Sequence, residues 1–507
     1  MIFISTILTY LEQTACQYPD KIACVDEGRA YTFAQLRAGS RAVGSALSHH
    51  IRSREPVAVY LEKSGGALTA FLGAVCAGGF YVYLNPELPP ARLRQVQSVL
   101  QARYVITDEA HRGAMEDLFP PESILLLDDL LAAPEEPERL DAAARRAIDT
   151  DPLYANFTSG STGVPKGVVV SHRSVLDFID VFADTFGFTK DDRIANQAPF
   201  DFDVSVKDIY TALKTGATLV LVPRRLFSRP KELLDFLCEQ KVTVMIWAVS
   251  ALCLISTLHG LDYRTPDTVE KVLFSGEVMP AKHLKQWMEH LPRAEFVNLY
   301  GPTEITCNCT YHVLDRSRAY EEGIPIGQAF PNEEVFLLDG EDQEIWKEGV
   351  TGEICVRGTA LALGYYRAPE QTAAAFTPDP RNPAYGETIY RTGDLGRYGP
   401  GGELFYSGRK DFQIKHMGHR VELEEIERTI SAQPQVERCC CVFDEARQKI
   451  RGFYLGQVDS AALRRELRDL LPAFMIPNTL EQVTEFPLTK NGKTDRKKLL
   501  ERRGTHG

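Results

Sequence analysis

The feature that most restricts the possible folds is an alternation of short strand-like runs with helix-like stretches between roughly residues 30 and 240. The runs are rich in β-branched and aromatic residues, and the stretches between them are long enough for helices. Strands that alternate with helices along a chain form parallel sheets covered by helices. We therefore expect an α/β fold, from strand-like segments at residues 56–60, 103–107, 217–222 and 242–247 and helix-like segments at residues 66–76 and 251–255.

The pattern changes after about residue 320, where glycines become frequent and short strands dominate. Residues 353–357, 403–406 and 413–415 are typical of a small barrel or a distorted antiparallel sheet. A mixed α/β segment follows after about residue 412, with a helix that begins near Glu422. Residues 132–146 are charged and indicate an exposed loop and helix.

Composition excludes several classes of protein. The 507 residues carry 57 Lys and Arg against 69 Asp and Glu, a formal net charge of −12. An acidic surface disfavours nonspecific binding to nucleic acid or to an anionic membrane. No run of about 18 apolar residues is present, so no membrane span is expected. The apolar residues 1–13 lack a basic start and a cleavage site, and they favour a packed amphipathic helix over a signal peptide.

The eleven cysteines give no pattern of a disulfide framework or a zinc site. Three of them are adjacent, at Cys439, Cys440 and Cys441, and no pair has the CxxC spacing of zinc ligands. We expect reduced, buried thiols in a cytoplasmic protein.

The segment 157–168, Phe-Thr-Ser-Gly-Ser-Thr-Gly-Val-Pro-Lys-Gly-Val, is the most informative in the chain. Glycines let backbone N–H groups approach an anion closely, and the hydroxyls and Lys166 add further donors. The segment therefore predicts a phosphate-binding loop; the alternative is a flexible surface turn. It departs from the P-loop pattern at Pro165 and Gly167, and it connects two expected strands rather than a strand and a helix, which disfavours a P-loop kinase or ATPase.

This loop resembles the signature of the acyl-adenylate-forming superfamily, and companion motifs follow in the order typical of that family. Residues 31–36 resemble its first core motif, and residues 81–86 depart from its usual pattern only in a structural segment. The resemblance spans essentially the whole chain and is carried further by residues 298–304, 351–358, 364–366, 390–395, 408–415 and 487–496.

The resemblance implies a large N-terminal adenylate-forming domain, residues 1–410, with two helix-flanked β-sheets and a small distorted β-barrel. It implies a small mobile α+β domain, residues 411–507, which rotates about a hinge at Asp411 and carries a catalytic lysine, Lys493. ATP and Mg²⁺ are the implied cofactors. Lys493 would bridge the substrate carboxylate and the α-phosphate.

The resemblance also implies roles for the nucleotide-binding residues. Tyr300 would stack on adenine, Glu304 would help to bind Mg²⁺, Asp394 would accept hydrogen bonds from the ribose, and Arg409 would lie beside it. The β- and γ-phosphates would be held by Thr158, Ser159, Ser161, Thr162 and Lys166. Further nucleotide-binding positions are Gly160, Gly163, Gly276, Glu277, Asn298, Gly301 and Thr303.

Two features favour an amino-acid-activating branch, the adenylation domains of nonribosomal peptide synthetases and the D-alanine–carrier-protein ligases. Residues 491–496 are typical of it, and Asp203 stands where this branch binds the substrate ammonium group. Asp201 is a rival for that role, and Asp203 could instead cap the helix that follows it. In a binding module without activity, Lys493, Glu304 or Asp394 would be replaced; all three are present.

The side chain of the amino acid is predicted from the residues that the resemblance maps to its pocket. Lys207 in a mostly apolar pocket favours a polar or acidic substrate; alternatively, Lys207 points outward or pairs with a protein carboxylate. Lys207 and Ser275 depart from the D-alanine ligases. The mapped pocket residues are Asp203, Val204, Lys207, Ile246, Leu273, Ser275, Leu299, Cys307 and Asn308.

No phosphopantetheine-attachment segment follows Arg496, so the acceptor is expected to be the phosphopantetheine thiol of a carrier protein in trans, through a transient interface. Two alternative functions remain open. One is D-alanine–carrier-protein ligation, and the other is acyl-CoA ligation of a simple carboxylic acid.

Overall fold

The computed structural model describes residues 6–160, 163–320, 323–445, 447–487 and 494–501. The chain divides into two compact units, each described below by itself. The first comprises Met1–Pro86, Ala102–Asn156 and Val168–Lys410, and the second comprises Glu87–Gln101, Phe157–Gly167 and Asp411–Gly507.

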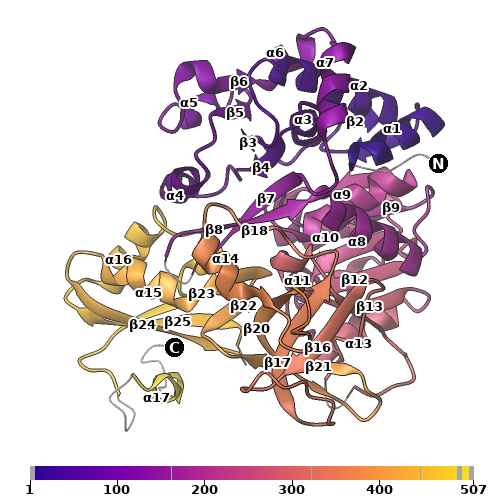
Figure 1. The fold of residues 1–507 in the computed structure, drawn as a ribbon. Helices are drawn as coiled ribbons and strands as arrows, with labels where there is room; N and C mark the ends of the chain where they lie inside the picture. The colour runs from indigo at the N-terminus through magenta and orange to yellow at the C-terminus, as the bar shows by residue number, and fades with distance from the viewer. Residues whose placement is uncertain (1–5, 161–162, 321–322, 446, 488–493, 502–507) are drawn as a thin grey trace. The chain divides into compact units, whose positions relative to one another are not determined.

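A nine-stranded sheet is the largest sheet of the first unit (Figure 1). Its five central strand pairs are parallel, whereas the two pairs at one end and the single pair at the other end are antiparallel. This confirms the predicted parallel arrangement. In spatial order the strands are β15 (Gln328–Ala329), β14 (Thr310–Val313), β13 (Glu295–Tyr300), β12 (Lys271–Ser275), β11 (Val244–Ala248), β9 (Arg193–Asn196), β10 (Thr218–Leu221), β1 (Ile22–Val25) and β2 (Ala30–Thr32).

Alternate residues of these strands enter two separate hydrophobic clusters, as the two-residue period of a strand requires. Ile246 and Leu273 pack with α8 (His172–Thr185) and α9 (Val204–Thr215). Their neighbours Met245 and Val272 pack with residues of α10 (Pro230–Glu239), α11 (Val249–Thr257) and α13 (Ala281–His290). The sheet is thus covered by helices on both faces.

A seven-stranded sheet carries the N-terminal helices. Its strands, in spatial order, are β18 (Gly364–Tyr365), β8 (Lys166–Ser171), β7 (Pro152–Thr158), β4 (Phe80–Tyr83), β3 (Pro56–Val59), β5 (Tyr104–Thr107) and β6 (Ile124–Leu126). The expected strands on either side of the phosphate-binding loop are β7 and β8. The accompanying helices are α1 (Leu8–Gln17), α2 (Phe33–Leu47), α3 (Gly65–Cys76), α5 (Arg112–Met115), α6 (Leu127–Ala132) and α7 (Pro137–Arg146). Helix α4 (Pro90–Leu100) belongs to the second unit.

Helix α2 begins at the first motif noted in the sequence. The Thr32 side chain accepts a hydrogen bond from the Gln35 backbone N–H, and the Gln35 side chain accepts one from the Thr32 N–H, which forms a capping box. Helix α2 then packs closely on α3, because Gly73 has no side chain. A Cβ atom at Gly73 would lie 2.4 Å from Cγ1 of Val43.

The predicted small barrel or distorted antiparallel sheet corresponds to a five-stranded antiparallel sheet. Its register shifts once between β17 and β20 and once between β20 and β21. The strands are β16 (Glu333–Leu338), β17 (Thr351–Gly358), β20 (Thr388–Tyr398), β19 (Phe376–Pro378) and β21 (Leu404–Arg409), with α14 (Pro369–Ala375) before β19. Helix α12 (Gly260–Tyr263) and the 3₁₀ turns η1 (Pro121–Ser123), η2 (Arg224–Ser228) and η3 (Thr303–Ile305) complete this unit.

The second unit contains a two-stranded and a three-stranded sheet. We grouped residues 413–415 with the distorted sheet, but they belong to the hairpin of β22 (Gln413–His416) and β23 (His419–Glu422). Two residues with positive φ, Met417 and Gly418, close this hairpin. Helix α15 (Leu423–Ser431) begins where predicted, and β24 (Val436–Asp444), β25 (Lys449–Gly456), α16 (Ser460–Leu467), η4 (Ala473–Met475), β26 (Thr479–Gln482) and α17 (Arg496–Glu501) follow.

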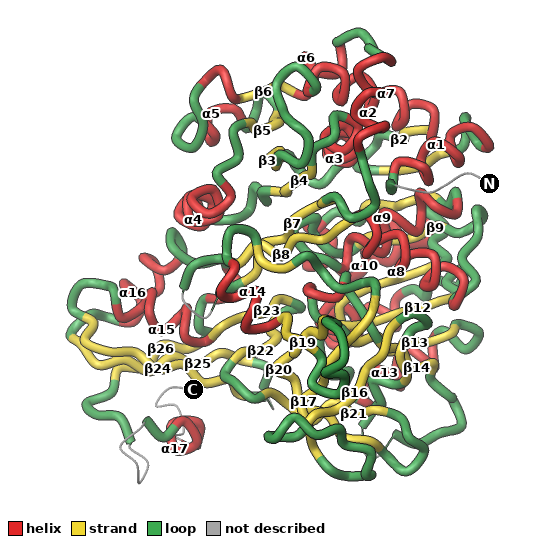
Figure 2. The backbone as a smooth tube through the Cα atoms, in the orientation of Figure 1, coloured by secondary structure: helices red, strands yellow, loops and turns green. Residues whose placement is uncertain are grey.

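The three adjacent cysteines lie on β24 and point to alternate faces of the sheet. Cys439 and Cys441 pack with residues of α15 and α16, whereas Cys440 packs with Leu499 of α17. Figure 2 shows α15 and α16 beside this sheet and α17 on its other side. All eleven cysteines are free, and seven of them are buried as predicted, whereas Cys16 is exposed and Cys76, Cys238 and Cys253 are partly exposed.

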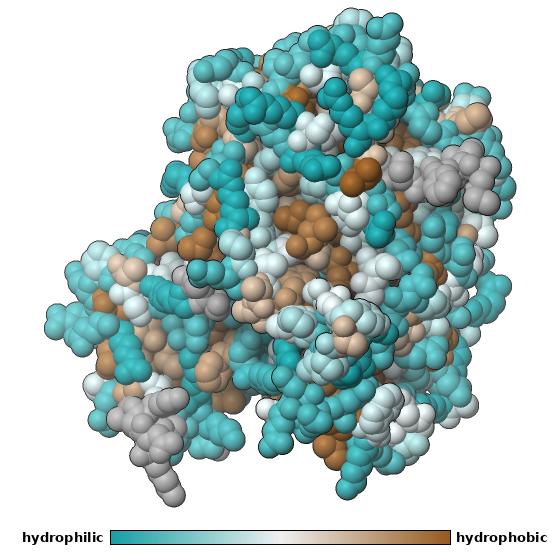
Figure 3. All heavy atoms as spheres, in the orientation of Figure 1, coloured by the Kyte–Doolittle hydropathy of each residue, from teal (hydrophilic) through white to brown (hydrophobic). Residues whose placement is uncertain are grey.

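Hydrophilic residues cover most of the face shown in Figure 3. Within the described part of the chain, no helix is long and apolar enough to cross a membrane.

A buried histidine makes the stability of the fold depend on pH. His172 accepts a hydrogen bond from the Ile7 backbone N–H at Nδ1 (3.2 Å), and burial lowers the pKa of His172 from 6.5 to about 4. The unfolded chain therefore binds this proton first, and the stabilisation present above pH 6.5 is lost as the pH falls toward 4. We expect this one group to cost about 3 kcal/mol over that range.

The measurement is urea unfolding of the wild type and of His172→Gln at pH 7 and pH 4.5. Glutamine keeps an acceptor but does not titrate. The free energy of unfolding should fall more steeply in the wild type, and an equal fall in both proteins would contradict the prediction.

Candidate functional site

Most of the predicted residues of the first unit lie at one edge of the nine-stranded sheet. In a parallel sheet the carboxyl ends of the strands share an edge, and ligands bind outside it. Asp203 follows β9, Gly276 and Glu277 follow β12, and Gly301 follows β13. The fold therefore brings together residues that are far apart in the sequence.

A hydrogen-bonded network links Tyr300, Asp394 and Arg409, all of which are buried or nearly so. The Tyr300 hydroxyl donates to Oδ2 of Asp394 (2.6 Å), and Nη1 of Arg409 donates to Oδ1 (2.5 Å). Asp394 and Arg409 are opposite each other on β20 and β21. Burial and the nearby Asp394 carboxylate raise the pKa of Tyr300 well above its usual value. The carboxylate is held in place, and each of its oxygens keeps a further lone pair for hydroxyl donors of a ligand.

Other predicted nucleotide-binding residues lie on β13 or shortly after β12 and β13. Asn298 of β13 is buried and donates through Nδ2 to the Pro325 carbonyl oxygen (2.8 Å). Thr303 begins η3 and is also buried. Gly276 has a φ of 95°, which its lack of a side chain permits, and it turns the chain after β12 toward Glu277.

A strained turn positions the last two pocket residues. Thr306 and Cys307 have φ values of 51° and 78°, a region that costs non-glycine residues of order 1 kcal/mol each. The Thr306 hydroxyl donates to the Ala360 carbonyl oxygen (2.7 Å) and so anchors the turn. Gly301 fits against it, since a Cβ atom there would lie 2.4 Å from Cα of Asn308. The turn thus carries Cys307 and Asn308 back toward β13.

Glu304, the predicted magnesium ligand, is fully buried on η3. Its Oε1 accepts a hydrogen bond from the Tyr365 hydroxyl (2.7 Å). Within the described residues no group of three or more His, Cys, Asp or Glu side chains could hold a metal ion. A single carboxylate fits Mg²⁺, which is usually bound by one or two carboxylates together with substrate phosphates and water.

Asp203 lies at the N-cap position of α9, but its side chain makes no capping hydrogen bond. The capping alternative is therefore wrong for this side chain. The Cys307 thiol donates to the Asp203 carbonyl oxygen (2.9 Å), which joins the start of α9 to the strained turn. The rival Asp201 accepts a hydrogen bond from Nδ2 of Asn85 (3.1 Å).

The predicted side-chain pocket is buried throughout. Lys207 has no exposed surface, so the outward-pointing alternative is wrong, and its Nζ donates to Oδ1 of Asn308 (2.6 Å). Ile246 and Leu273 are neighbours in register on β11 and β12, and Ser275 is opposite Ala248 two residues further on. The remaining predicted residues are buried on α9, on β13 and in the strained turn: Val204, Leu299 and Cys307.

The phosphate-binding loop lies in the second unit. Gly160 must be glycine, because a Cβ atom would lie 2.1 Å from the Val164 carbonyl oxygen, and the Gly163 N–H donates to the Gly160 carbonyl oxygen (2.8 Å). Lys166 is partly buried at the start of β8. The Thr158 hydroxyl is buried and has no hydrogen-bond partner in the described part of the chain. An unused buried hydroxyl in a glycine-containing loop fits a phosphate ligand.

Three predicted site residues, Ser161, Thr162 and Lys493, lie outside the described residues. Asp411 is the first residue of the C-terminal segment of the second unit, and its Oδ1 accepts a hydrogen bond from the Gln413 N–H (3.2 Å).

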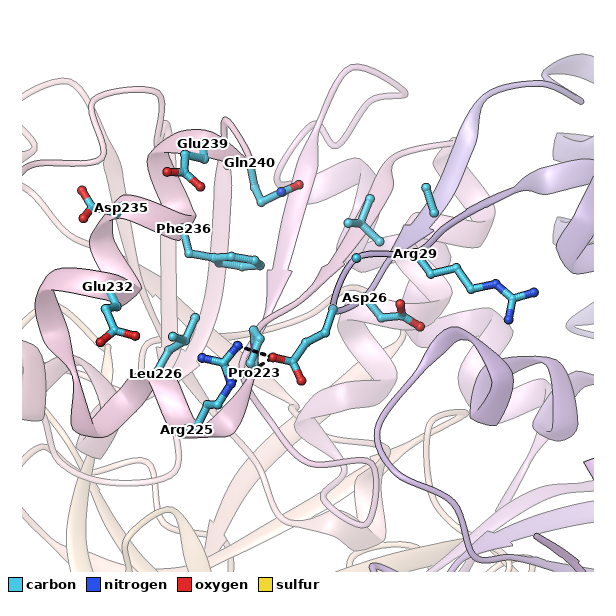
Figure 4. A pocket seen from close by; sticks show the side chains of 14 residues that line it. Asp26, Arg29, Pro223, Arg225, Leu226, Glu232, Asp235, Phe236, Glu239 and Gln240 are labelled. Carbon is cyan, nitrogen blue, oxygen red and sulfur yellow. Dashed lines mark hydrogen bonds and ion pairs between the residues drawn. The ribbon is translucent and has the colours of Figure 1, made fainter. Parts of the chain in front are cut away.

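A separate pocket of about 850 Å³ lies between the β1–β2 turn and α10 (Figure 4). None of the residues that line it is a predicted site residue. Among its charged side chains, Arg225 pairs with Glu27, and Asp235 with Arg264.

Sequence reasoning missed several residues that hold the site. Tyr365 donates a hydrogen bond to Glu304, although the motif at residues 364–366 gave it no predicted role. Thr306 anchors the strained turn, and neither Thr306 nor Cys307 is a glycine that would have indicated a turn. Arg92 and Glu425 form a buried ion pair beside the phosphate-binding loop, in segments 333 residues apart. Only the three-dimensional fold brings such pairs together.

Comparisons with known proteins agree with this geometry. The family model described as AMP-binding enzyme matches residues 11–366. The chain is 32% identical to the D-alanine–D-alanyl carrier protein ligase of Bacillus thuringiensis (strain Al Hakam), over 97% of this chain and 99% of that protein. It is 34% identical to tyrocidine synthase 3 of Brevibacillus parabrevis over 97% of this chain, but it spans only 8% of that protein's length. The structure of holo-PA1221, a nonribosomal peptide synthetase protein with adenylation and carrier domains, superposes with a TM-score of 0.82 and 26% identity, covering 98% of this chain and 84% of that one.

Proposed function

We propose that this chain, which belongs to the AMP-binding enzyme family, activates an amino acid with ATP and passes it to the thiol of a carrier protein. In the first step a carboxylate oxygen of the amino acid attacks the α-phosphorus of ATP. The bond to pyrophosphate breaks, and aminoacyl-AMP forms. In the second step the phosphopantetheine thiol loses its proton and attacks the acyl carbon, and AMP leaves. Positioning and charge stabilisation supply most of the catalysis in such reactions.

The observation that carries this proposal is the Tyr300–Asp394–Arg409 network. A buried carboxylate fixed by a phenol and a guanidinium suits the two hydroxyls of a ribose, and the Tyr300 ring beside it suits a purine. Thr158, Ser159 and Lys166 of the loop suit the triphosphate, together with Ser161 and Thr162. Asn298, Gly301, Thr303 and the Gly276–Glu277 turn complete the nucleotide site in this proposal.

Three further roles belong to the same proposal. Glu304 would hold Mg²⁺, which when bound would supply positive charge for the triphosphate. Lys493 neutralises charge between the substrate carboxylate and the α-phosphate. The chain works as an N-terminal domain, residues 1–410, and a C-terminal domain, residues 411–507, that rotates about Asp411 between the two steps.

The amino acid is bound by Asp203 through its ammonium group, and its side chain is polar or acidic. Lys207 supports the assignment of a polar or acidic side chain. It is fully buried, donates a hydrogen bond to Asn308 and lies on the helix that Asp203 precedes. An ammonium group can donate a charge-assisted hydrogen bond to a carboxylate or an amide oxygen of the substrate. The relatives include D-alanine–carrier-protein ligases, which makes D-alanine the second candidate substrate.

Substitution of Lys207 tests the side-chain assignment. We expect Lys207→Met to lower kcat/KM for the preferred polar or acidic amino acid about 100-fold, since a buried charge pair is lost. The relative rate with alanine or valine should rise. Lys214→Met is the matched control, since Lys214 lies on the same helix but pairs with Asp180 near the surface. An unchanged order of substrates in Lys207→Met would contradict the assignment.

Amino-acid-dependent exchange of radiolabelled pyrophosphate into ATP tests the activation step, with each amino acid and each enantiomer in turn. Exchange with one or a few amino acids is the expected result. Exchange with none, together with formation of CoA thioesters from simple carboxylic acids, would replace the proposal by acyl-CoA ligation.

A further inference from the structure

A carboxylate from α15 accepts a hydrogen bond from one backbone N–H group of the phosphate-binding loop. Oε2 of Glu425 accepts a hydrogen bond from the backbone N–H of Gly160 (3.3 Å), and Oε1 accepts one from Nη1 of Arg92 (2.6 Å). Arg92 lies on α4, and all three residues belong to the second unit. Both side chains are buried, with 6% of Arg92 and 3% of Glu425 exposed. One carboxylate therefore bridges the loop backbone and a buried guanidinium.

A second donor of the loop is used in the same way. The Ser159 hydroxyl donates to the carbonyl oxygen of Arg420 (2.8 Å), at the end of the hairpin that precedes α15. Two consecutive loop residues thus donate to oxygen atoms from residues 420–425. Backbone N–H groups and hydroxyls of such a loop are the donors that a phosphate requires, and a carboxylate is the protein group most similar to a phosphate in charge and acceptor atoms.

The ion pair is not explained by a gain in stability. Burial raises the pKa of the Glu425 carboxyl even though Arg92 and the Gly160 N–H oppose that change. Replacing a buried ion pair by apolar residues is often neutral or stabilising, so such a pair is weak evidence for a structural role. Guanidinium groups bind phosphate oxygens as well as they bind carboxylates, through two parallel hydrogen bonds.

We propose that the guanidinium of Arg92 and the Gly160 amide form an anion site for the terminal phosphates of ATP and for pyrophosphate, and that the Glu425 carboxylate competes for it. This inference rests on the proposed function, which supplies the phosphate ligand. Phosphate binding then separates Glu425 from Arg92, and departure of pyrophosphate lets the carboxylate return. Arg92 becomes a phosphate-binding residue, and Glu425 an internal competitor.

Calorimetric titration of the full chain with inorganic pyrophosphate, in the presence of MgCl₂, tests the proposal without any need for turnover. We expect Arg92→Gln to weaken pyrophosphate binding at least about tenfold, because a charge-assisted hydrogen bond is lost. Glu425→Gln should tighten it about tenfold, since an uncharged amide competes poorly with phosphate for Arg92. Arg92→Lys, which keeps the positive charge, should retain most of the affinity.

Matched controls lie on the same two helices. Arg94→Gln changes an exposed arginine of α4, and Glu424→Gln changes a half-exposed carboxylate of α15 that pairs with Arg428. Neither should alter pyrophosphate affinity more than twofold. Thermal unfolding identifies any variant that fails to fold. If that variant is Glu425→Gln, the loss of affinity in Arg92→Gln and its retention in Arg92→Lys decide; if it is Arg92→Gln, the tighter binding of Glu425→Gln decides.

Two outcomes would overturn the proposal. One is an Arg92→Gln protein that binds pyrophosphate within twofold of the wild type. The other is a Glu425→Gln protein that binds it as weakly as Arg92→Gln, which would make the pair a structural support of the loop. A wild type that binds pyrophosphate with this pattern but exchanges it with no amino acid would refute the amino-acid assignment and leave the anion site standing.

Discussion

Replacing Asp203 by Asn should reduce amino-acid-dependent pyrophosphate exchange by at least about 100-fold. The substrate ammonium group would enter a buried site without its counter-charge, and removing one partner of such a pair costs about 2–5 kcal/mol. The side chain is not a helix cap, so the folded protein should lose little stability. Exchange kinetics and thermal unfolding of the same preparation separate the two effects.

Asp201→Asn is the matched control for Asp203→Asn, because the two aspartates are two residues apart and Asp201 contacts Asn85. It should keep exchange within a few-fold of the wild type. If Asp201→Asn abolishes exchange and Asp203→Asn does not, the two roles are reversed. If neither variant abolishes exchange, the substrate carries no ammonium group in this pocket, and acyl-CoA ligation becomes the favoured function.

The second large effect is expected at Asp394. In Asp394→Ala the Tyr300 hydroxyl loses its acceptor and the largely buried Arg409 guanidinium loses its partner carboxylate. Breaking a buried pair in this way costs about 3 kcal/mol of folding stability, because an uncompensated charge stays in the interior. The KM for ATP should rise about 100-fold as well, since the ribose hydroxyls lose their acceptor.

Asp394→Asn separates the two losses, because an amide keeps one oxygen acceptor and the shape of the side chain. It should unfold at a temperature closer to the wild type and still show a raised KM for ATP. Asp342→Asn is the matched control: Asp342 pairs with Arg391 of the same strand, β20, but is half-exposed. A normal KM for ATP in both Asp394 variants would remove this residue from the nucleotide site.

The periodic parts of the fold could be predicted from the sequence, because local physics determines them. Strand-like runs alternate with helices, and each predicted strand overlaps an observed one, as residues 103–107 do with β5 at Tyr104–Thr107. The error at residues 413–415 has a physical reason. Those residues do form a strand, but whether it joins a larger sheet depends on the positive-φ turn at Met417 and Gly418, which folds it back on β23.

Contacts between distant residues could not be predicted from residue patterns alone. The motifs containing Tyr300 and Asp394 were recognised one at a time, but the hydrogen bond between their side chains joins residues 94 positions apart. The left-handed turn at Thr306 and Cys307 has no glycine or asparagine at either position, the usual signals for positive φ. Tertiary contacts, such as the Thr306 hydroxyl with the Ala360 carbonyl oxygen, impose that turn.

The walls of the proposed amino-acid pocket are also part of the protein's main hydrophobic core. Ile246, Leu273, Leu299 and Cys307 belong to one continuous cluster with the residues that hold α8 and α9 on the sheet. A change of substrate that enlarges or shrinks this pocket therefore leaves a void or an overlap in the core. We infer that new specificities evolve here most easily through exchanges of polar groups at near-constant volume, and that variants selected for a larger substrate will need stabilising substitutions elsewhere.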